Sequence, residues 1–271
     1  MRDGYAEVEG GRLWHRVDGS GPRVLFIPGY TLDLTMWDLQ VEALRDRFTC
    51  IRFDPRGAGR SPPPTGPYTY IADVEALLSH LGIERAHLVG FSLGAAIALD
   101  FTLAHPKKVR SLTLIDASAV GGYPWPDRLK PAFAEISRLA AAGDIAAAKR
   151  AWLGHPWFAP ALERPDSARR LRAIFDTYSG WHLANRNPAS MGTPPAFARL
   201  AEIAVPTLVI AGDRDLDFYN LPLADALAAG IPGARREIIP GAGHMSNLEA
   251  PEAVNRLLAG FLNSHSGHAA V

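Results

Sequence analysis

The sequence predicts an α/β protein built on one mostly parallel sheet of eight strands, with helices on both faces and an inserted helical cap. Short apolar runs alternate with amphipathic segments, which is typical of βαβ units with right-handed crossovers. This alternation stops near residue 121 and returns near residue 196. The chain has 271 residues and a hydrophobic content of 48%, so it can bury a large core.

The first part of the core is predicted over residues 1–120. Residues 5–8 and 12–17 alternate between apolar and polar side chains, which predicts an antiparallel hairpin. Four continuous apolar runs follow, and such runs are expected of strands that are buried on both faces. These strands are predicted over 24–27, 49–53, 86–89 and 109–115, and the helices between them over 36–46, 70–81 and 95–104.

Residues 121–195 contain no strand pattern and are predicted to form the helical cap. An insertion between two sheet strands packs over one end of the sheet. The cap holds four of the six tryptophans, which either line an apolar substrate pocket or only pack the cap on the core. These residues are Trp125, Trp152, Trp157 and Trp181. The helices of the cap are predicted over Pro131–Ala142, Asp144–Leu153 and Asp166–Tyr178.

The second part of the core is predicted over residues 196–271. The alternation returns there, with strands predicted over 207–211 and 235–239 and helices over 222–229 and 251–262. The tail from Asn263 is predicted to be frayed.

Composition excludes several classes of protein. Lys+Arg and Asp+Glu both number 28, so no basic field indicates a nucleic-acid partner. The one cysteine, Cys50, excludes an internal disulfide and is predicted to be a core residue. His265 and His268 could pair as metal ligands, but a frayed tail disfavours such a site. With no signal-peptide pattern and no membrane-length apolar run, we expect a cytoplasmic monomer or homodimer.

The stretch Gly90-Phe91-Ser92-Leu93-Gly94 reads Gly-x-Ser-x-Gly between a predicted strand and a predicted helix. This order matches a nucleophile elbow, which presents a serine at the end of a strand. Glycines two residues before and after the serine let the strand and helix approach closely. Ser92 is therefore the predicted nucleophile. The alternative is a glycine-rich turn with a capping serine.

A serine hydroxyl needs a general base, and the base needs an acid that orients it. His244 follows the last predicted strand in a loop of small residues and is the predicted base. Asp215 lies three residues after the glycine that ends the strand 207–211, and it is the predicted acid. Asp116, at the end of an earlier strand, is the rival acid. The histidines predicted to be structural are His87 and His105.

Two backbone N–H groups are needed where negative charge develops on the substrate. One is predicted on Leu93, directly after the nucleophile. The other is predicted on Tyr30, in the loop after the strand 24–27.

With these residues the chain resembles the α/β-hydrolase family over nearly all of its length outside the cap. Residues 91–93 match the elbow of the family, residues 212–215 its acid turn, and Gly243-His244 its histidine loop. Residues 54–61 match the Asp-x-Arg-Gly-x-Gly-x-Ser loop, which is usually structural. The chain is most similar to the enol-lactonase and small-ester hydrolase branch. Three short scaffold motifs support this similarity: residues 35–38, 66–69 and 246–252.

Two residues and one segment depart from the pattern of the family. Pro28 and Ala58 stand where histidine is common, and the segment 68–74 is shorter than usual. The first change leaves a backbone donor possible but alters the support of the loop.

The resemblance implies hydrolysis of carboxylic esters or lactones through an acyl-enzyme on Ser92, with no metal or organic cofactor. The same triad also serves carbon–carbon hydrolases of diketones and cofactor-free haloperoxidases or perhydrolases, so these remain alternatives. A protein that only binds its ligand would require a broken triad. These residues do not specify the natural substrate.

Overall fold

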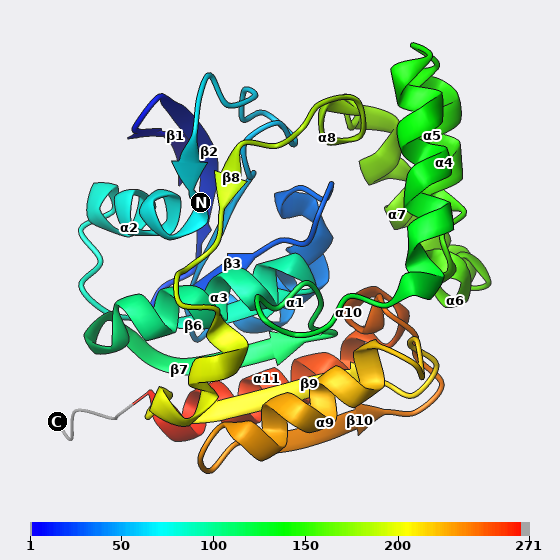
Figure 1. Cartoon of the computed structure of the whole chain (residues 1–271). Helices are drawn as coiled ribbons and strands as arrows, with labels where there is room; N and C mark the ends of the chain where they lie inside the picture. Colours follow the sequence, from blue (N-terminus) through cyan, green and yellow to red (C-terminus); the bar gives the residue numbers. More distant parts are fainter. Residues whose placement is uncertain (1, 267–271) are drawn as a thin grey trace, which may run out of the picture.

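The computed structural model describes residues 2–266 (Figure 1). Its central sheet has eight strands in the order β1-β2-β4-β3-β6-β7-β9-β10. The pairs β1–β2 and β2–β4 are antiparallel, and the other neighbours are parallel. The predicted α/β class and mostly parallel sheet are confirmed. The strands are β1 Arg2–Val8, β2 Gly11–Asp18, β3 Arg23–Ile27, β4 Thr49–Phe53, β6 Ala86–Phe91, β7 Val109–Ile115, β9 Thr207–Gly212 and β10 Arg235–Ile239.

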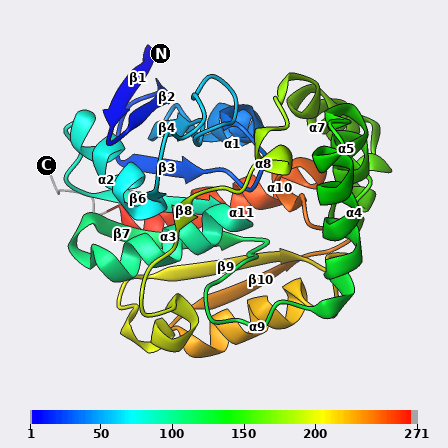
Figure 2. The same ribbon diagram turned by 45° about the horizontal axis from the view of Figure 1, so that its top comes forward.

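Helices cover both faces of this sheet (Figure 2). Helices α1 and α11 contact each other on one face, while α2, α3 and α9 lie along the other. The strands β3, β6 and β9 are buried along most or all of their length, as expected for a sheet covered on both sides. The helices of the core are α1 Asp38–Leu44, α2 Tyr70–His80, α3 Leu93–Ala104, α9 Asn220–Gly230, α10 Ser246–Glu249 and α11 Pro251–His265.

The segment 121–195 forms five α-helices that stand beyond the carboxyl ends of the strands, in green and yellow-green in Figure 1. They are α4 Lys130–Ala141, α5 Ile145–Leu153, α6 Ala159–Leu162, α7 Pro165–Thr177 and α8 Trp181–Ala184. The prediction that this segment lacks a strand was wrong at β8, Ala189–Ser190, which pairs with β5, Tyr68–Thr69. A hydrogen bond between the Tyr68 hydroxyl and Asn187 Oδ1 holds the two segments together there.

Several element ends differ from the predictions by one to a few residues. The helix predicted over 36–46 begins as a 3₁₀ turn at Leu34 and ends at Leu44. The tail is helical up to His265, where we predicted fraying from Asn263, because Phe261, Leu262 and Ser266 are buried and hold the end of the helix on the core. The rest of the tail, with His268, lies outside the described residues. The 3₁₀ helices are η1 Leu34–Trp37, η2 Pro106–Lys108, η3 Asp127–Leu129, η4 Pro156–Phe158 and η5 Ala196–Glu202.

Cys50 and His87 belong to residue types that can be reactive, but both are buried inside the sheet. Cys50 is fully buried in β4, and burial raises the pKa of its thiol to about 12, so the thiol stays protonated. His87 is fully buried in β6, where burial lowers its pKa to about 4. Its Nδ1 lies 2.7 Å from the hydroxyl of Ser111. Neither residue lies in the cavity described below.

The loop after β4 is held by a buried carboxylate. Asp54 Oδ1 accepts a hydrogen bond from the N–H of Leu34, and Oδ2 accepts one from the N–H of Arg60. Nearby, Arg56 makes a two-pronged pair with Asp73, at 2.7 and 2.8 Å. The loop therefore ties β4 to its neighbours, which is the structural role that the family resemblance implied.

The Asp54 carboxyl is expected to make folding stability depend on pH. Burial raises its pKa to about 6. In the window between its ordinary value and about pH 6, the folded chain holds a proton that the unfolded chain has lost. The free energy of unfolding should therefore fall as pH rises through this window, by up to about 3 kcal/mol. Urea unfolding of the wild type and of Asp54→Asn at several pH values checks this. Equal slopes in the two proteins would contradict it.

None of the helices among residues 2–266 combines the length and the apolar character that a bilayer crossing requires.

Candidate active site

Ser92 lies at the sharp turn between β6 and α3, with a backbone φ of 52°. Residues other than glycine rarely adopt a positive φ, and such a backbone is typical of a strained functional turn. A Cβ on Gly90 would lie 2.2 Å from the carbonyl oxygen of Gly94, and one on Gly94 would lie 2.1 Å from that of Ile27. Only glycine fits at both positions, so the predicted elbow has the close packing that its sequence pattern requires.

Three side chains that are distant in the sequence form one hydrogen-bonded chain. The Ser92 Oγ lies 3.0 Å from Nε2 of His244, and the Asp215 Oδ2 lies 2.8 Å from Nδ1 of the same ring. All three residues are buried. Asp215 also accepts a hydrogen bond from the N–H of Leu216, which fixes its carboxylate toward the imidazole. The structure thus brings together the three residues predicted as nucleophile, base and acid.

Asp116, the rival acid, binds the surrounding backbone instead. Its Oδ1 accepts a hydrogen bond from the N–H of Gly212, and its Oδ2 accepts two from the N–H and hydroxyl of Ser246. Burial, and then the nearby charge of Asp215, raise the pKa of Asp116 well above its ordinary value. The carboxylate that contacts His244 is therefore that of Asp215, while Asp116 holds the loops on either side of it.

The two predicted oxyanion donors belong to segments that meet at Ser92. Tyr30 and Leu93 both line the cavity that contains the Ser92 hydroxyl. A Cβ on Gly29, directly before Tyr30, would lie 3.3 Å from Cβ of Ser92. The change from histidine to Pro28 therefore leaves the loop after β3 in contact with the elbow.

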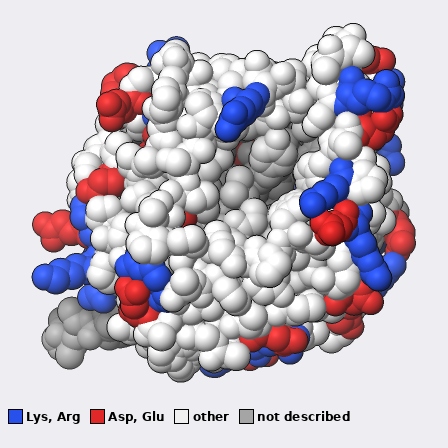
Figure 3. Space-filling view, viewed as in Figure 1, with Lys and Arg blue, Asp and Glu red and all other residues white. Residues whose placement is uncertain are grey.

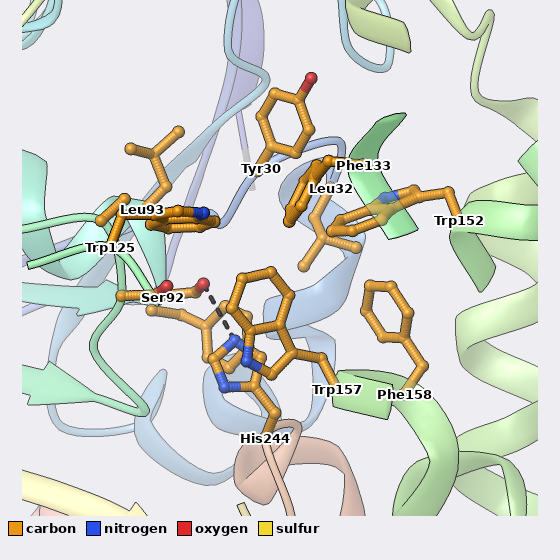
Figure 4. A pocket seen from close by; sticks show the side chains of 13 residues that line it. Tyr30, Leu32, Ser92, Leu93, Trp125, Phe133, Trp152, Trp157, Phe158 and His244 are labelled. Carbon is orange, nitrogen blue, oxygen red and sulfur yellow. Dashed lines mark hydrogen bonds between the residues drawn. The ribbon is translucent and has the colours of Figure 1, made fainter. Parts of the chain in front are cut away.

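Ser92 and His244 open into one cavity of about 230 Å³ under the cap (Figure 4). Three of the four predicted tryptophans line it: Trp125, Trp152 and Trp157. Ligand pockets commonly measure about 300–1,000 Å³, so this cavity suits a small ligand or the reacting end of a larger one. Its full lining is Tyr30, Leu32, Phe91, Ser92, Leu93, Ser118, Ala119, Trp125, Phe133, Trp152, Trp157, Phe158 and His244.

The prediction that Trp181 lines the pocket was wrong. Trp181 begins the short helix α8, and its ring packs near Gly57, where an added Cβ would lie 3.1 Å from the indole. It therefore packs the cap on the core. Sequence reasoning missed Phe133 and Phe158, which both line the cavity. Phe158 directly follows Trp157, so this pair of aromatic residues could have indicated that Phe158 also lines the cavity.

Trp157 connects the cap directly to the predicted base. Its indole stacks on the imidazole of His244, with ring centroids 5.0 Å apart and an angle of 21° between the planes. The indole Nε1 donates a 2.7 Å hydrogen bond to Asn220 Oδ1 at the start of α9. The cap tryptophan therefore covers one face of the imidazole and limits the access of water to it.

No lysine, arginine, aspartate or glutamate is among the residues that line this cavity. The space-filling view agrees, because the floor of the hollow between core and cap is uncharged, and Lys, Arg, Asp and Glu lie at its rim (Figure 3). A mostly apolar wall with the Ser92 hydroxyl and the His244 imidazole at its floor suits an uncharged ligand that carries an electrophilic carbon.

The family described as the alpha/beta hydrolase fold matches residues 22–251. The chain belongs to this family, as its sequence motifs and its sheet indicate. A protein of Azorhizobium caulinodans named "Putative carbamate hydrolase RutD" is 31% identical over 95% of this chain and 97% of its own length. A hydrolase of Pseudomonas aeruginosa matches with a TM-score of 0.81 and 33% identity, covering 96% of this chain and 98% of its own. The enol-lactonase of Burkholderia xenovorans matches with a TM-score of 0.82 and 29% identity, covering 96% and 100%.

Proposed function

We propose that this chain is a serine hydrolase that cleaves uncharged, apolar carboxylic esters or lactones through an acyl-enzyme on Ser92. The observation that carries the proposal is the continuous contact from Asp215 through His244 to the Ser92 hydroxyl at the floor of the cavity. A serine becomes a useful nucleophile near neutral pH only beside such a base. The enol-lactonase among the similar structures supports the same reaction class.

The proposed reaction has two halves. In the first, the Ser92 oxygen attacks the carbonyl carbon while His244 Nε2 takes the hydroxyl proton, and the N–H groups of Tyr30 and Leu93 stabilise the oxyanion. The imidazolium then protonates the leaving alkoxide, and the alcohol departs. In the second half, His244 takes a proton from water, which attacks the acyl carbon. Collapse of the second oxyanion releases the acid and returns the proton to Ser92.

The preference for an uncharged acyl group follows from the lining of the cavity. A substrate carboxylate would lose its hydration there without meeting a lysine or arginine among the lining residues. Burying a charge without a partner is costly, so such a substrate should bind weakly. The aromatic side chains of Trp125, Phe133 and Trp152 instead suit a short alkyl or aryl group.

A panel of matched substrates tests this proposal. We expect kcat/KM for 4-nitrophenyl butyrate to exceed that for 4-nitrophenyl succinate, which carries a carboxylate at a similar position, by about 100-fold or more. Simple lactones and a vinylogous diketone complete the panel. Turnover of the diketone above that of every ester and lactone would favour carbon–carbon hydrolysis. Faster hydrolysis of the succinate would contradict the uncharged preference.

Trp125 offers a variant for the same panel. It lies at the mouth of the cavity and is 39% exposed, so its replacement should cost less stability than that of the buried Trp152 or Trp157. Trp125→Ala is expected to raise KM for 4-nitrophenyl benzoate while leaving 4-nitrophenyl acetate nearly unchanged, because only the larger group reaches the mouth. Equal effects on the two esters would mean that this wall does not contact the substrate.

A further inference from the structure

We infer that Glu249 is a positioning residue for the reaction: its carboxylate bridges the backbone on both sides of His244 and holds the imidazole in line between Asp215 and Ser92. This inference rests on the proposed function of that triad. In the sequence, Glu249 stands only within a scaffold motif, residues 246–252, and has no predicted chemical role.

The carboxylate of Glu249 accepts one hydrogen bond on each side of the predicted base. Oε2 accepts from the N–H of Gly243 at 2.8 Å, and Oε1 accepts from the N–H of Met245 at 3.0 Å. Both oxygens are used as acceptors, which is the arrangement of an ionised carboxylate. A bridge across three successive residues fixes the backbone position and direction of His244 more tightly than either bond alone.

The bridge lies in a buried and crowded place. Glu249 is 6% exposed, and burial raises the pKa of its carboxyl. The two N–H donors, and then the charges of Arg164 and of protonated His244, act in the opposite direction. Arg214 pairs with Glu163, and the charge of Glu249 is a smaller cause that raises the pKa of Arg214. A buried carboxylate therefore adds negative potential beside the imidazole, which favours the imidazolium that forms during the reaction.

The cap holds the same loop from its other side. Arg164, at the start of α7, donates to the carbonyl oxygen of Gly241 at 2.7 Å and to that of Glu249 at 3.2 Å. A Cβ on Gly243 would lie 2.5 Å from Pro160 in α6, so the loop has no free space there. With the loop confined on both sides, the carboxylate of Glu249 holds the backbone from which the imidazole extends toward Asp215 and Ser92.

Glu249→Gln tests the inference, because glutamine keeps the shape but has one acceptor oxygen and no charge. We expect kcat to fall by about 10- to 100-fold with KM within about twofold of wild type. The acid limb of the rate–pH profile should move by about 0.5 to 1 unit to lower pH, because the imidazolium is stabilised less. A role in folding alone would lower the thermal midpoint without moving that limb.

Two further variants make the test specific. Glu249→Asp keeps the charge but is too short to reach both N–H groups, so it should lose kcat while the acid limb stays near its wild-type position. Asp100→Asn removes another buried carboxylate that accepts a backbone N–H, that of Gly192 at 2.8 Å, away from the cavity, and it should change neither quantity. Equal losses in Asp100→Asn and Glu249→Gln would overturn the inference.

The rate at which a fluorophosphonate labels Ser92 provides a readout that needs no ester substrate. Labelling requires the nucleophile and its base, so Glu249→Gln should label about 10- to 100-fold more slowly than wild type. A wild-type chain that labels but hydrolyses none of the panel would remove the proposed substrate class and leave this inference standing. Equal labelling rates in the two proteins would overturn the inference alone. A wild-type chain that does neither would overturn both.

Discussion

Replacing Ser92 with alanine is expected to lower ester hydrolysis by about 10⁴- to 10⁶-fold. The change removes the only atom that the proposed mechanism places in covalent contact with the substrate, and losses of this size are typical when such a nucleophile is deleted. The remaining rate would come from substrate binding and the oxyanion donors. Steady-state kinetics with 4-nitrophenyl butyrate measure the loss, and mass spectrometry after fluorophosphonate treatment checks that the variant carries no adduct.

A matched serine serves as the control for this prediction. Ser111 is fully buried in the neighbouring strand β7, where its hydroxyl bonds to His87 and not to the cavity. Ser111→Ala should retain near wild-type activity. Ser92→Ala should also unfold at nearly the wild-type temperature, because it removes one oxygen at a site that opens into the cavity. Unchanged hydrolysis in Ser92→Ala would remove the mechanism altogether.

Asp215→Asn is expected to lower kcat by about 10⁴-fold. The amide would present a donor or a weaker acceptor to Nδ1 of His244, so the imidazole would no longer be held in the tautomer that accepts the proton of Ser92. KM should change little, because Asp215 is not among the residues that line the cavity. Steady-state kinetics on the purified variant measure both parameters.

Asp116→Asn is the comparison for that result. Asp116 is also buried beside the cluster, but it binds Ser246 and the backbone of Gly212 rather than the imidazole. Its replacement should disturb the loops and cost much less activity than Asp215→Asn. A larger loss in Asp116→Asn would assign the acid role to that residue instead.

The sequence predicted the core well because the physical signals there are local. The strand at 207–211 and the turn that follows it are read from a continuous apolar run and a glycine. In the same way, the spacing of Gly90, Ser92 and Gly94 reflects a steric need that operates within five residues, and the backbone contacts of the two glycines bear it out.

The cap was harder to predict because its contacts depend on tertiary packing. Trp152 lies in a predicted helix and Trp181 follows one, and neither pattern shows that only Trp152 lines the cavity. Helices α5 and α8 both contact α4, but Trp152 of α5 faces the cavity, whereas Trp181 of α8 packs against Gly57 of the core. No local pattern carries that information. The contact between Trp157 and His244 joins residues 87 positions apart, so it could not be predicted from a local pattern either.

The attachment of α6 and α7 to the core limits how this protein can be re-engineered. Glu163 pairs with Arg214 beside the acid turn at 2.8 Å, and Arg164 binds the histidine loop. A chimera that exchanged the whole cap for that of a relative would remove the outer support of both loops together with the old specificity. Grafts that keep residues 160–164 and exchange only α4 and α5 should alter the choice of substrate while retaining the contacts of His244 with Asp215 and Ser92.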